Sequence, residues 1–202
     1  MNYNQTLKEY HNRIETNCVR RIEEYLEAPL VFEYYQYWKT LNREGIIENM
    51  LHELKKSFDV FWTNPKFNTA DISIIFLEWG GISSGWGVEA YGCKNDTIGI
   101  KTTEFYPQYE DYESDNNFNT IPTFTLPPLQ KLCMEYELFN DKDSEYTVVF
   151  DLLVQTSYLL AFETFVKFNE DTQFKGFKLK KPFRIAIGEH DTGNLTPLLI
   201  LI

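Results

Sequence analysis

The most constraining stretch of the sequence runs from Ile72 to Trp79, because both of its faces are apolar when it is drawn as a strand. In a strand, successive side chains point to opposite faces, and here both sets are apolar from Ile74 until Glu78. A strand that is covered on one side only would alternate apolar with polar residues. The pattern therefore predicts a central strand with packing on both sides.

The segments that follow predict an antiparallel meander. Residues 80–85 are rich in glycine and serine, which favour a chain reversal. Residues 86–91 then alternate as a second strand, and residues 97–106 are expected to form a third.

The first third of the chain predicts three helices. Apolar residues recur every three or four positions from Gln5 to Leu26, and Pro29 is expected to end this helix. The aromatic residues of 31–41 have the same spacing and favour a short helix, although their composition also suits a strand. A third helix over residues 47–61 is expected to stop at Pro65.

The last third of the chain supplies a buried helix and two further strands. Residues 146–168 are apolar almost all round, which predicts one long buried helix on the sheet, with a strand over residues 146–154 as the alternative. Residues 174–188 and 195–202 are expected to be strands, the last of them paired within the sheet. The predicted fold is a single α+β domain over residues 1–202: N-terminal helices, a mostly antiparallel sheet of about five strands, and one long buried helix packed on that sheet.

Composition limits the classes of function. The chain has 202 residues, of which 43% are apolar and 16% aromatic, so it can bury a full core and is not a disordered chain. Its 30 acidic and 19 basic residues give a formal net charge of -11, which opposes general binding to nucleic acid or anionic membranes and favours a basic partner. Three scattered cysteines, an N-terminus without a secretory signal and the lack of a bilayer-spanning apolar run predict a soluble cytoplasmic protein.

Residues 102–130 have the most unusual composition, because this segment contains no lysine or arginine. Carboxylates and aromatic rings alternate in it, and four prolines divide it, so it is expected to be a long irregular segment with a functional role. Tyrosine gives a large contact area with few rotatable bonds, and clustered carboxylates attract a basic partner. The predicted partner-binding residues are Glu104, Tyr106, Tyr109, Glu110, Asp111, Tyr112, Glu113 and Asp115. The alternative is a solvated loop whose aromatic rings fold back onto the sheet.

A second candidate site surrounds the hairpin. Two carboxylates beside two indoles can line a pocket, and paired carboxylates can act as acid and base when their pKa values separate. The residues of this possible ligand pocket are Glu78, Trp79, Trp86, Glu89, Tyr91 and His190. In the alternative interpretation, the tryptophans belong to the core and the glutamates are ordinary exposed strand residues.

Other catalytic and binding motifs are weak or missing from the sequence. The three histidines are far apart and form no metal-binding pair, and the glycines of 80–87 fit neither a phosphate loop nor a dinucleotide fingerprint. Asp191-Thr192-Gly193 occurs once, whereas an aspartic-protease site needs two such carboxylates. Lysines and phenylalanines alternate over residues 174–184, as in single-stranded nucleic-acid sites, but this pattern is also typical of a solvated strand with core aromatics. No cofactor is predicted.

The sequence therefore favours a non-enzymatic intracellular module that binds, and in binding inhibits, a basic protein partner. In broad composition the chain resembles bacterial toxin-neutralising immunity proteins, which are often small, acidic and cytosolic. This resemblance covers no motif and assigns no residues. The alternative is an enzyme or a small-ligand-binding protein with its cleft near Glu78, Trp79, Trp86, Glu89 and His190.

Overall fold

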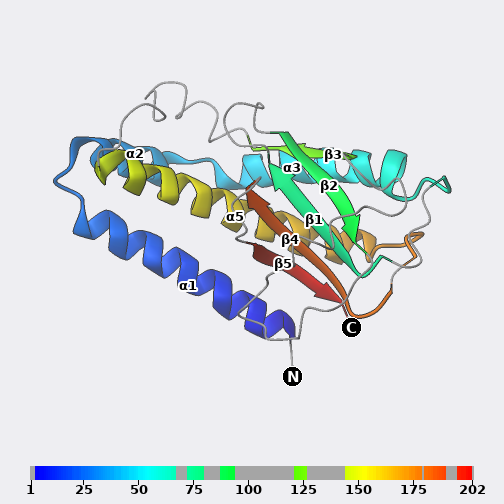
Figure 1. The fold of residues 1–202 in the computed structure, drawn as a ribbon. Coiled ribbons are helices and arrows are strands. Elements are labelled where there is room, and N and C mark those ends of the chain that lie inside the picture. Colours follow the sequence, from blue (N-terminus) through cyan, green and yellow to red (C-terminus); the bar gives the residue numbers. More distant parts are fainter. Residues whose placement is uncertain are drawn as a thin grey trace.

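The computed structural model describes residues 3–66, 72–79, 87–93, 121–126, 144–178, 180–189 and 195–201. Within these residues, helices pack on a five-stranded mixed sheet, and one long helix lies against that sheet (Figure 1). The predicted α+β fold is confirmed, including its N-terminal helices and its long packed helix.

The sheet has the strand order β3-β2-β1-β4-β5. Its strands are β1 (Ile74–Trp79), β2 (Gly87–Cys93), β3 (Ile121–Thr125), β4 (Phe183–Glu189) and β5 (Thr196–Leu201). Strand β1 pairs antiparallel with β2 and parallel with β4, whereas the other two pairs are antiparallel. The double-sided apolar pattern of β1 thus identified the central strand correctly.

The prediction of an irregular segment over residues 102–130 is wrong at β3. This strand pairs antiparallel with β2, and Pro122 lies opposite Glu89. Ile121 and Phe124 are buried while Pro122 is exposed, which is how proline is accommodated at the edge of a sheet. The third strand expected at residues 97–106 lies outside the described residues.

The N-terminal helices follow the predicted order. They are α1 (Tyr3–Glu24), α2 (Pro29–Thr40) and α3 (Arg43–Ser57), and α3 continues into the π-helical turn η1 (Phe58–Trp62). The aromatic segment is therefore a helix rather than a strand. Pro29 separates α1 from α2 by opening α2, a position where its missing N–H costs no hydrogen bond.

Helix α5 (Ser144–Thr172) spans the segment whose alternative prediction was a strand over residues 146–154; that alternative is wrong. By length and composition alone, α5 could cross a membrane. Most of the apolar part of α5 is instead buried within the protein, as in a core helix. The helix is long because it must contact the sheet and the three N-terminal helices.

The strand predicted over residues 174–188 begins only at Phe183. Residues 173–176 form a turn in which Gly176 has a φ of 85°. Phe174 and Phe177 pack instead into an aromatic cluster, where the ring centroids of Phe168 and Phe174 are 5.2 Å apart. The first half of this segment is therefore a turn, and its phenylalanines are buried in the core.

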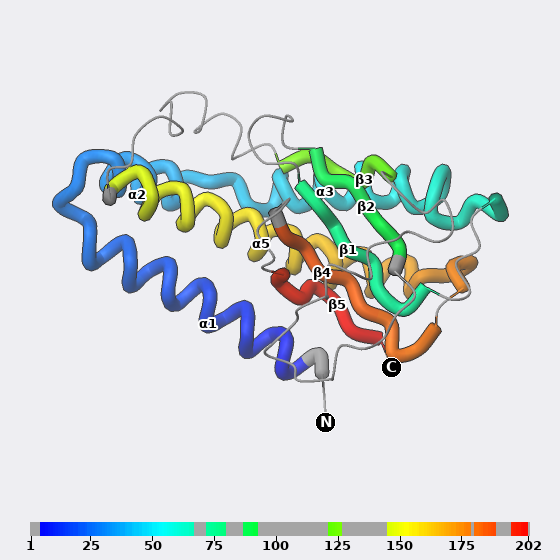
Figure 2. The backbone as a smooth tube through the Cα atoms, in the orientation of Figure 1, coloured from blue at the N-terminus to red at the C-terminus, as the bar shows by residue number. Residues whose placement is uncertain are grey.

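The helices are arranged so that α3 and α5 lie across one face of the sheet, while α1 lies along its β5 edge (Figure 1). Figure 2 shows α1 starting beside β5 and running away from it to meet α2 at the far end of the molecule. The α1 and α5 helices are antiparallel, since Arg21 forms an ion pair with Asp151 while His11 contacts Phe162. The β5 strand fills the space between their other ends.

Replacement of Phe168 by alanine should destabilise the protein strongly, because its ring is fully buried among other aromatic rings. We expect a loss of about 3–5 kcal/mol in the free energy of unfolding, measured by urea denaturation. Phe61→Ala is the matched control, because Phe61 is 38% exposed and should cost about 1 kcal/mol or less. Equal losses for the two variants would contradict this description of the core.

Candidate functional site

The predicted partner-binding residues 104–115 lie outside the described residues, as do Trp86 and His190. The structure therefore places four members of the proposed ligand pocket: Glu78, Trp79, Glu89 and Tyr91.

Three of these residues share one face of the sheet. Glu78 lies directly opposite Glu89, and Phe76 lies opposite Tyr91, in the β1–β2 pairing. The Tyr91 hydroxyl donates a hydrogen bond to Glu89 Oε2 at 3.0 Å. Burial, this hydrogen bond and the charge of Glu78 raise the pKa of the Tyr91 phenol well above its ordinary value, so the phenol stays protonated as a donor.

Trp79 lies on the opposite face and is completely buried. Its indole nitrogen donates a hydrogen bond to the Tyr158 hydroxyl at 3.2 Å, so it anchors α5 to the sheet. The structure thus brings together two carboxylates and a phenol but places the indole in the core. Within the described residues, no group of three His, Cys, Asp or Glu side chains could hold a metal ion.

The lysine- and phenylalanine-rich segment does not form a stacking surface for bases. Phe174, Phe177 and Phe183 are buried, as is Arg184, which is 1% exposed. The neighbouring lysines that the structure describes are exposed. A base could not stack on these rings, so this segment is the solvated edge of a packed core.

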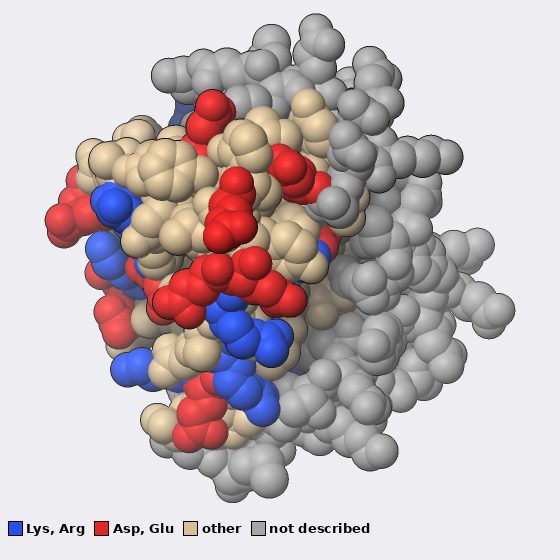
Figure 3. All heavy atoms as spheres, turned by 90° about the vertical axis from the view of Figure 1, so that its left-hand side faces the viewer, with Lys and Arg blue, Asp and Glu red and all other residues tan. Residues whose placement is uncertain are grey.

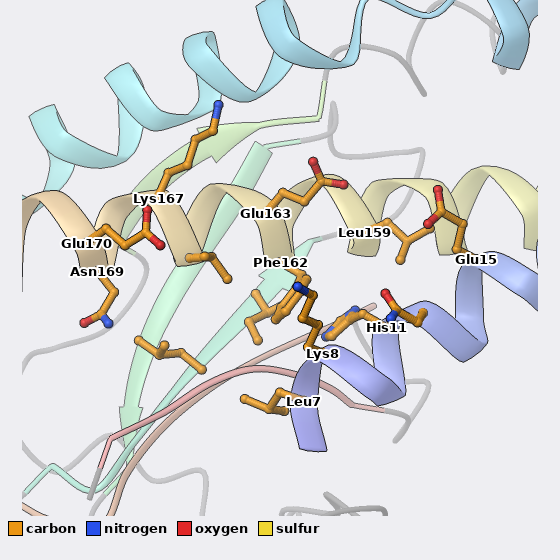
Figure 4. Close-up of a pocket in the computed structure, with 14 residues that line it drawn as sticks. Leu7, Lys8, His11, Glu15, Leu159, Phe162, Glu163, Lys167, Asn169 and Glu170 are labelled. Carbon is orange, nitrogen blue, oxygen red and sulfur yellow. The ribbon is translucent and has the colours of Figure 1, made fainter. Parts of the chain in front are cut away.

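A groove of about 700 Å³ lies between α1 and α5, with β5 at its base (Figure 4). We call it the α1–α5 groove. Its apolar lining residues are Leu7, Leu159, Phe162, Val166, Leu198 and Leu199. Its polar lining residues are Lys8, His11, Asn12, Glu15, Glu163, Lys167, Asn169 and Glu170. An apolar surface with a few polar groups is typical of small-molecule sites.

One face of α1 and one face of α5 form the two sides of the groove, and each face consists of residues from successive helical turns. The α1 lining residues start at Leu7 and recur at His11 and Glu15, and the α5 residues recur with the same helical spacing from Leu159. At this end α1 starts beside β5 (Figure 2), and the two helices meet there through the stacked rings of His11 and Phe162.

His11 is the most unusual polar residue of the groove, because it is only 2% exposed. Its ring stacks on Phe162 with 3.7 Å between the ring centroids, and its Nε2 lies 2.7 Å from the carbonyl oxygen of Pro197 in β5. A carbonyl can only accept, so Nε2 carries the proton and Nδ1 is the acceptor of the neutral ring. Within the described residues, Nδ1 has no hydrogen-bond partner.

The bond from His11 joins α1 to β5 at an irregular point of the sheet. The register of β4 and β5 shifts here, so that Ala186 pairs with Pro197 while Ile185 pairs with Leu199. Burial lowers the pKa of His11 to about 4, although the hydrogen bond to Pro197 acts in the opposite direction. The imidazole is therefore neutral at pH 7.

Arg43 bridges two glutamates that line opposite sides of the groove. Its guanidinium donates to Glu15 of α1 at 2.7 Å and to Glu163 of α5 at 2.6 Å. Arg43 is the first residue of α3, so one side chain connects three helices. All three side chains are about one-third or more exposed, so these contacts determine the helix arrangement more than the stability.

Sequence reasoning did not identify this groove, because its residues come from three separate segments. One signal was available: His11 occupies a core position of α1, between Leu7 and Cys18, where an apolar residue is the usual choice. A histidine in such a place indicates a specific polar contact, although the sequence cannot name its partner.

The buried His11 should make the protein sensitive to acid. The unfolded chain binds a proton near pH 6.5, but the folded protein does so only near pH 4, so stability falls as the pH is lowered between these values. We expect His11 to account for about 3 kcal/mol of that loss at most. Urea denaturation from pH 7 to pH 4 should show a reduced slope for His11→Gln, which retains an amide donor for Pro197. His52→Gln, on the exposed surface of α3, should keep the wild-type slope; an unchanged slope in His11→Gln would refute this assignment.

Comparisons with known proteins leave the site to be interpreted from its own geometry. No model of a protein family matches the chain, and neither a curated protein nor a solved structure matches it.

Proposed function

We propose that this protein is an intracellular, cytoplasmic binding module for a basic protein partner, and that it acts as an inhibitor of the toxin-neutralising immunity type. The observation that carries the proposal is an exposed apolar surface surrounded by carboxylates where α1 ends and α2 begins. We call this surface the acidic end, and its residues are Glu23, Glu24, Tyr25, Leu26, Glu27, Phe32 and Glu33.

The apolar part of the acidic end consists of Tyr25, Leu26 and Phe32, which are 38%, 36% and 48% exposed. Single exposed apolar residues are common, but here three large ones fall within eight positions of the chain, at the turn from α1 to α2. Aromatic side chains of this kind often supply the binding energy at the centre of a protein interface. The cluster therefore supports contact with another protein.

The glutamates of the acidic end indicate the sign of the charge that the partner should carry. Between Arg21 and Lys39 the chain contains four glutamates and no lysine or arginine. In Figure 3, which faces this end of the molecule, Asp and Glu side chains form a band across the described surface, with uncharged surface and further Asp and Glu side chains above it and Lys and Arg side chains below it. A negative surface beside an apolar centre attracts and orients a positively charged partner.

The acidic tyrosine-rich residues 104–115 are part of the same proposal, as a second contact with the basic partner. Their composition supports this role, because carboxylates and tyrosines alternate there without any lysine or arginine. Charge reversal distinguishes the two contacts, since each segment can be altered without changing the other.

The test is affinity capture from native lysate at low and at physiological salt, with association rates then measured for the captured protein. Glu23→Lys/Glu24→Lys should slow association about tenfold at low salt, because it replaces steering attraction by repulsion. Phe32→Ala should weaken the complex mainly by faster dissociation, because it removes an exposed ring from the centre of the contact.

Glu48→Lys/Asp59→Lys is the matched control, because both residues are exposed on α3 and η1, away from the acidic end. It makes the same change in net charge and should leave the association rate nearly unaltered. Equal slowing by the two double variants would mean that only total charge matters, and the acidic end would be removed from the proposal. Glu110→Lys/Asp111→Lys/Glu113→Lys tests the second contact in the same assay.

The alternative function, an enzyme or small-ligand binder with a cleft near the hairpin, is supported by one specific observation. Tyr91, Glu89 and Glu78 share one face of the sheet, an arrangement whose carboxylates could accept hydrogen bonds from a polar ligand. If the alternative holds, Tyr91→Phe should abolish ligand binding while the complex with a basic protein is unaffected.

A further inference from the structure

We propose that the α1–α5 groove binds a linear aliphatic carboxylate, with the aliphatic chain on the apolar base and the carboxylate beside Lys8. This site is separate from the proposed partner surface, which lies at the other end of α1. The inference rests on the lining of the groove, on the distribution of charge around it and on its size.

The base of the groove suits an aliphatic chain. Leu7 of α1, Leu159 of α5 and Leu198 of β5 form a buried aliphatic layer behind the groove, and the partly exposed Phe162 and Val166 of α5 present apolar surface to a ligand. The stacked rings of His11 and Phe162 continue this surface, and the imidazole carries no charge at pH 7. An aliphatic ligand would therefore leave water for a lining that is mostly apolar and already ordered.

The charges around the groove favour an anionic head group. Glu15 and Glu163 are both engaged by Arg43, which removes most of their demand for a cation. Within the described residues, Lys8 and Lys167 have no ion-pair partner. Lys8 is the better placed of the two, because it extends toward Phe162 while Lys167 points away from β5 (Figure 4).

The remaining polar residues fix the direction of the ligand. Asn12 follows Lys8 by one turn of α1 and adds an amide donor on the same side of the groove. Glu170 lines the groove at the end away from Glu15 (Figure 4) and would repel a carboxylate. The head group therefore lies on the Lys8 side, and the chain extends along the base below Phe162.

The groove is large enough for such a ligand. Its volume of about 700 Å³ lies within the range of small-molecule pockets, roughly 300–1,000 Å³. It is open on one side, so a ligand can enter without separation of α1 from β5 and the loss of the bond between His11 and Pro197.

The test is calorimetric titration of the full chain with dodecanoate below its micellar concentration, beside dodecylammonium at the same concentration. We expect saturable binding of one dodecanoate per chain and weaker binding of dodecylammonium. Lys8→Glu should weaken dodecanoate binding about three- to tenfold, because it turns an attraction at the rim into a repulsion. Val166→Trp should weaken it at least about tenfold by filling the groove with a larger side chain.

Two matched controls test whether these effects are local. Lys56→Glu, exposed on α3, and Val60→Trp, 50% exposed on η1, make the same chemical changes away from the groove and should bind dodecanoate as the wild type does. Thermal unfolding of each variant confirms that it is folded. If Val166→Trp does not fold, the comparison of Lys8→Glu with Lys56→Glu still tests the proposal. The proposal is overturned if the wild type shows no saturable binding, if Lys8→Glu binds as tightly as Lys56→Glu, or if dodecylammonium binds as well as dodecanoate.

Discussion

The arrangement of this protein depends on the burial of α5, which is apolar on nearly all sides and must therefore be covered from several directions. The sheet covers one side, and the N-terminal helices cover much of the rest. Polar groups of α5 find partners on these neighbours: Thr156 with Tyr34 at 2.6 Å and Gln155 with Cys18 at 3.0 Å. Hydrophobic burial supplies the driving force, and these few polar contacts select the rotation of α5 within its neighbours.

The same packing leaves the groove open. Along most of its length α1 is held close to α5, as in the ion pair of Arg21 with Asp151 at 2.8 Å. Toward its N-terminal end α1 is bound to β5 as well, through the hydrogen bond between His11 and Pro197, while the His11 ring still stacks on Phe162 of α5. Because α1 is attached to β5 near its N-terminus and to α5 near its C-terminus, it cannot lie parallel to α5 along its whole length. The groove is the geometric consequence of these two attachments.

Features carried by one continuous segment could be predicted from the sequence, and features that combine distant segments could not. The two apolar faces of β1 and the all-round apolarity of α5 predicted a central strand and a buried helix, since each pattern has few other solutions. The β3 strand was missed because Pro122 and the following prolines suggested a loop, although an edge strand tolerates proline where its missing N–H faces outward. Among the predicted pocket residues, Glu78, Glu89 and Tyr91 lie on one face of the sheet, whereas Trp79 points to the other face, toward α5, which is a direction that the sequence of β1 does not specify. The α1–α5 groove needed the pairing of His11 with Phe162 and Pro197, which no sequence pattern contains.

The acidic end is an exposed surface at the turn between α1 and α2, so its proposed binding depends on how firmly its backbone is held. Backbone hydrogen bonds close the turn between the helices, from Ala28 N–H to the Tyr25 carbonyl and from Phe32 N–H to the Ala28 carbonyl, both at 2.9 Å. Val31 and Tyr34, on either side of Phe32, are buried and fix the face that α2 presents. Because the backbone of this surface is already ordered, a partner would lose little free energy in organising it. If the proposed function holds, a small apolar cluster would contribute more to affinity than its area alone suggests, and the surrounding carboxylates would disfavour partners that lack positive charge.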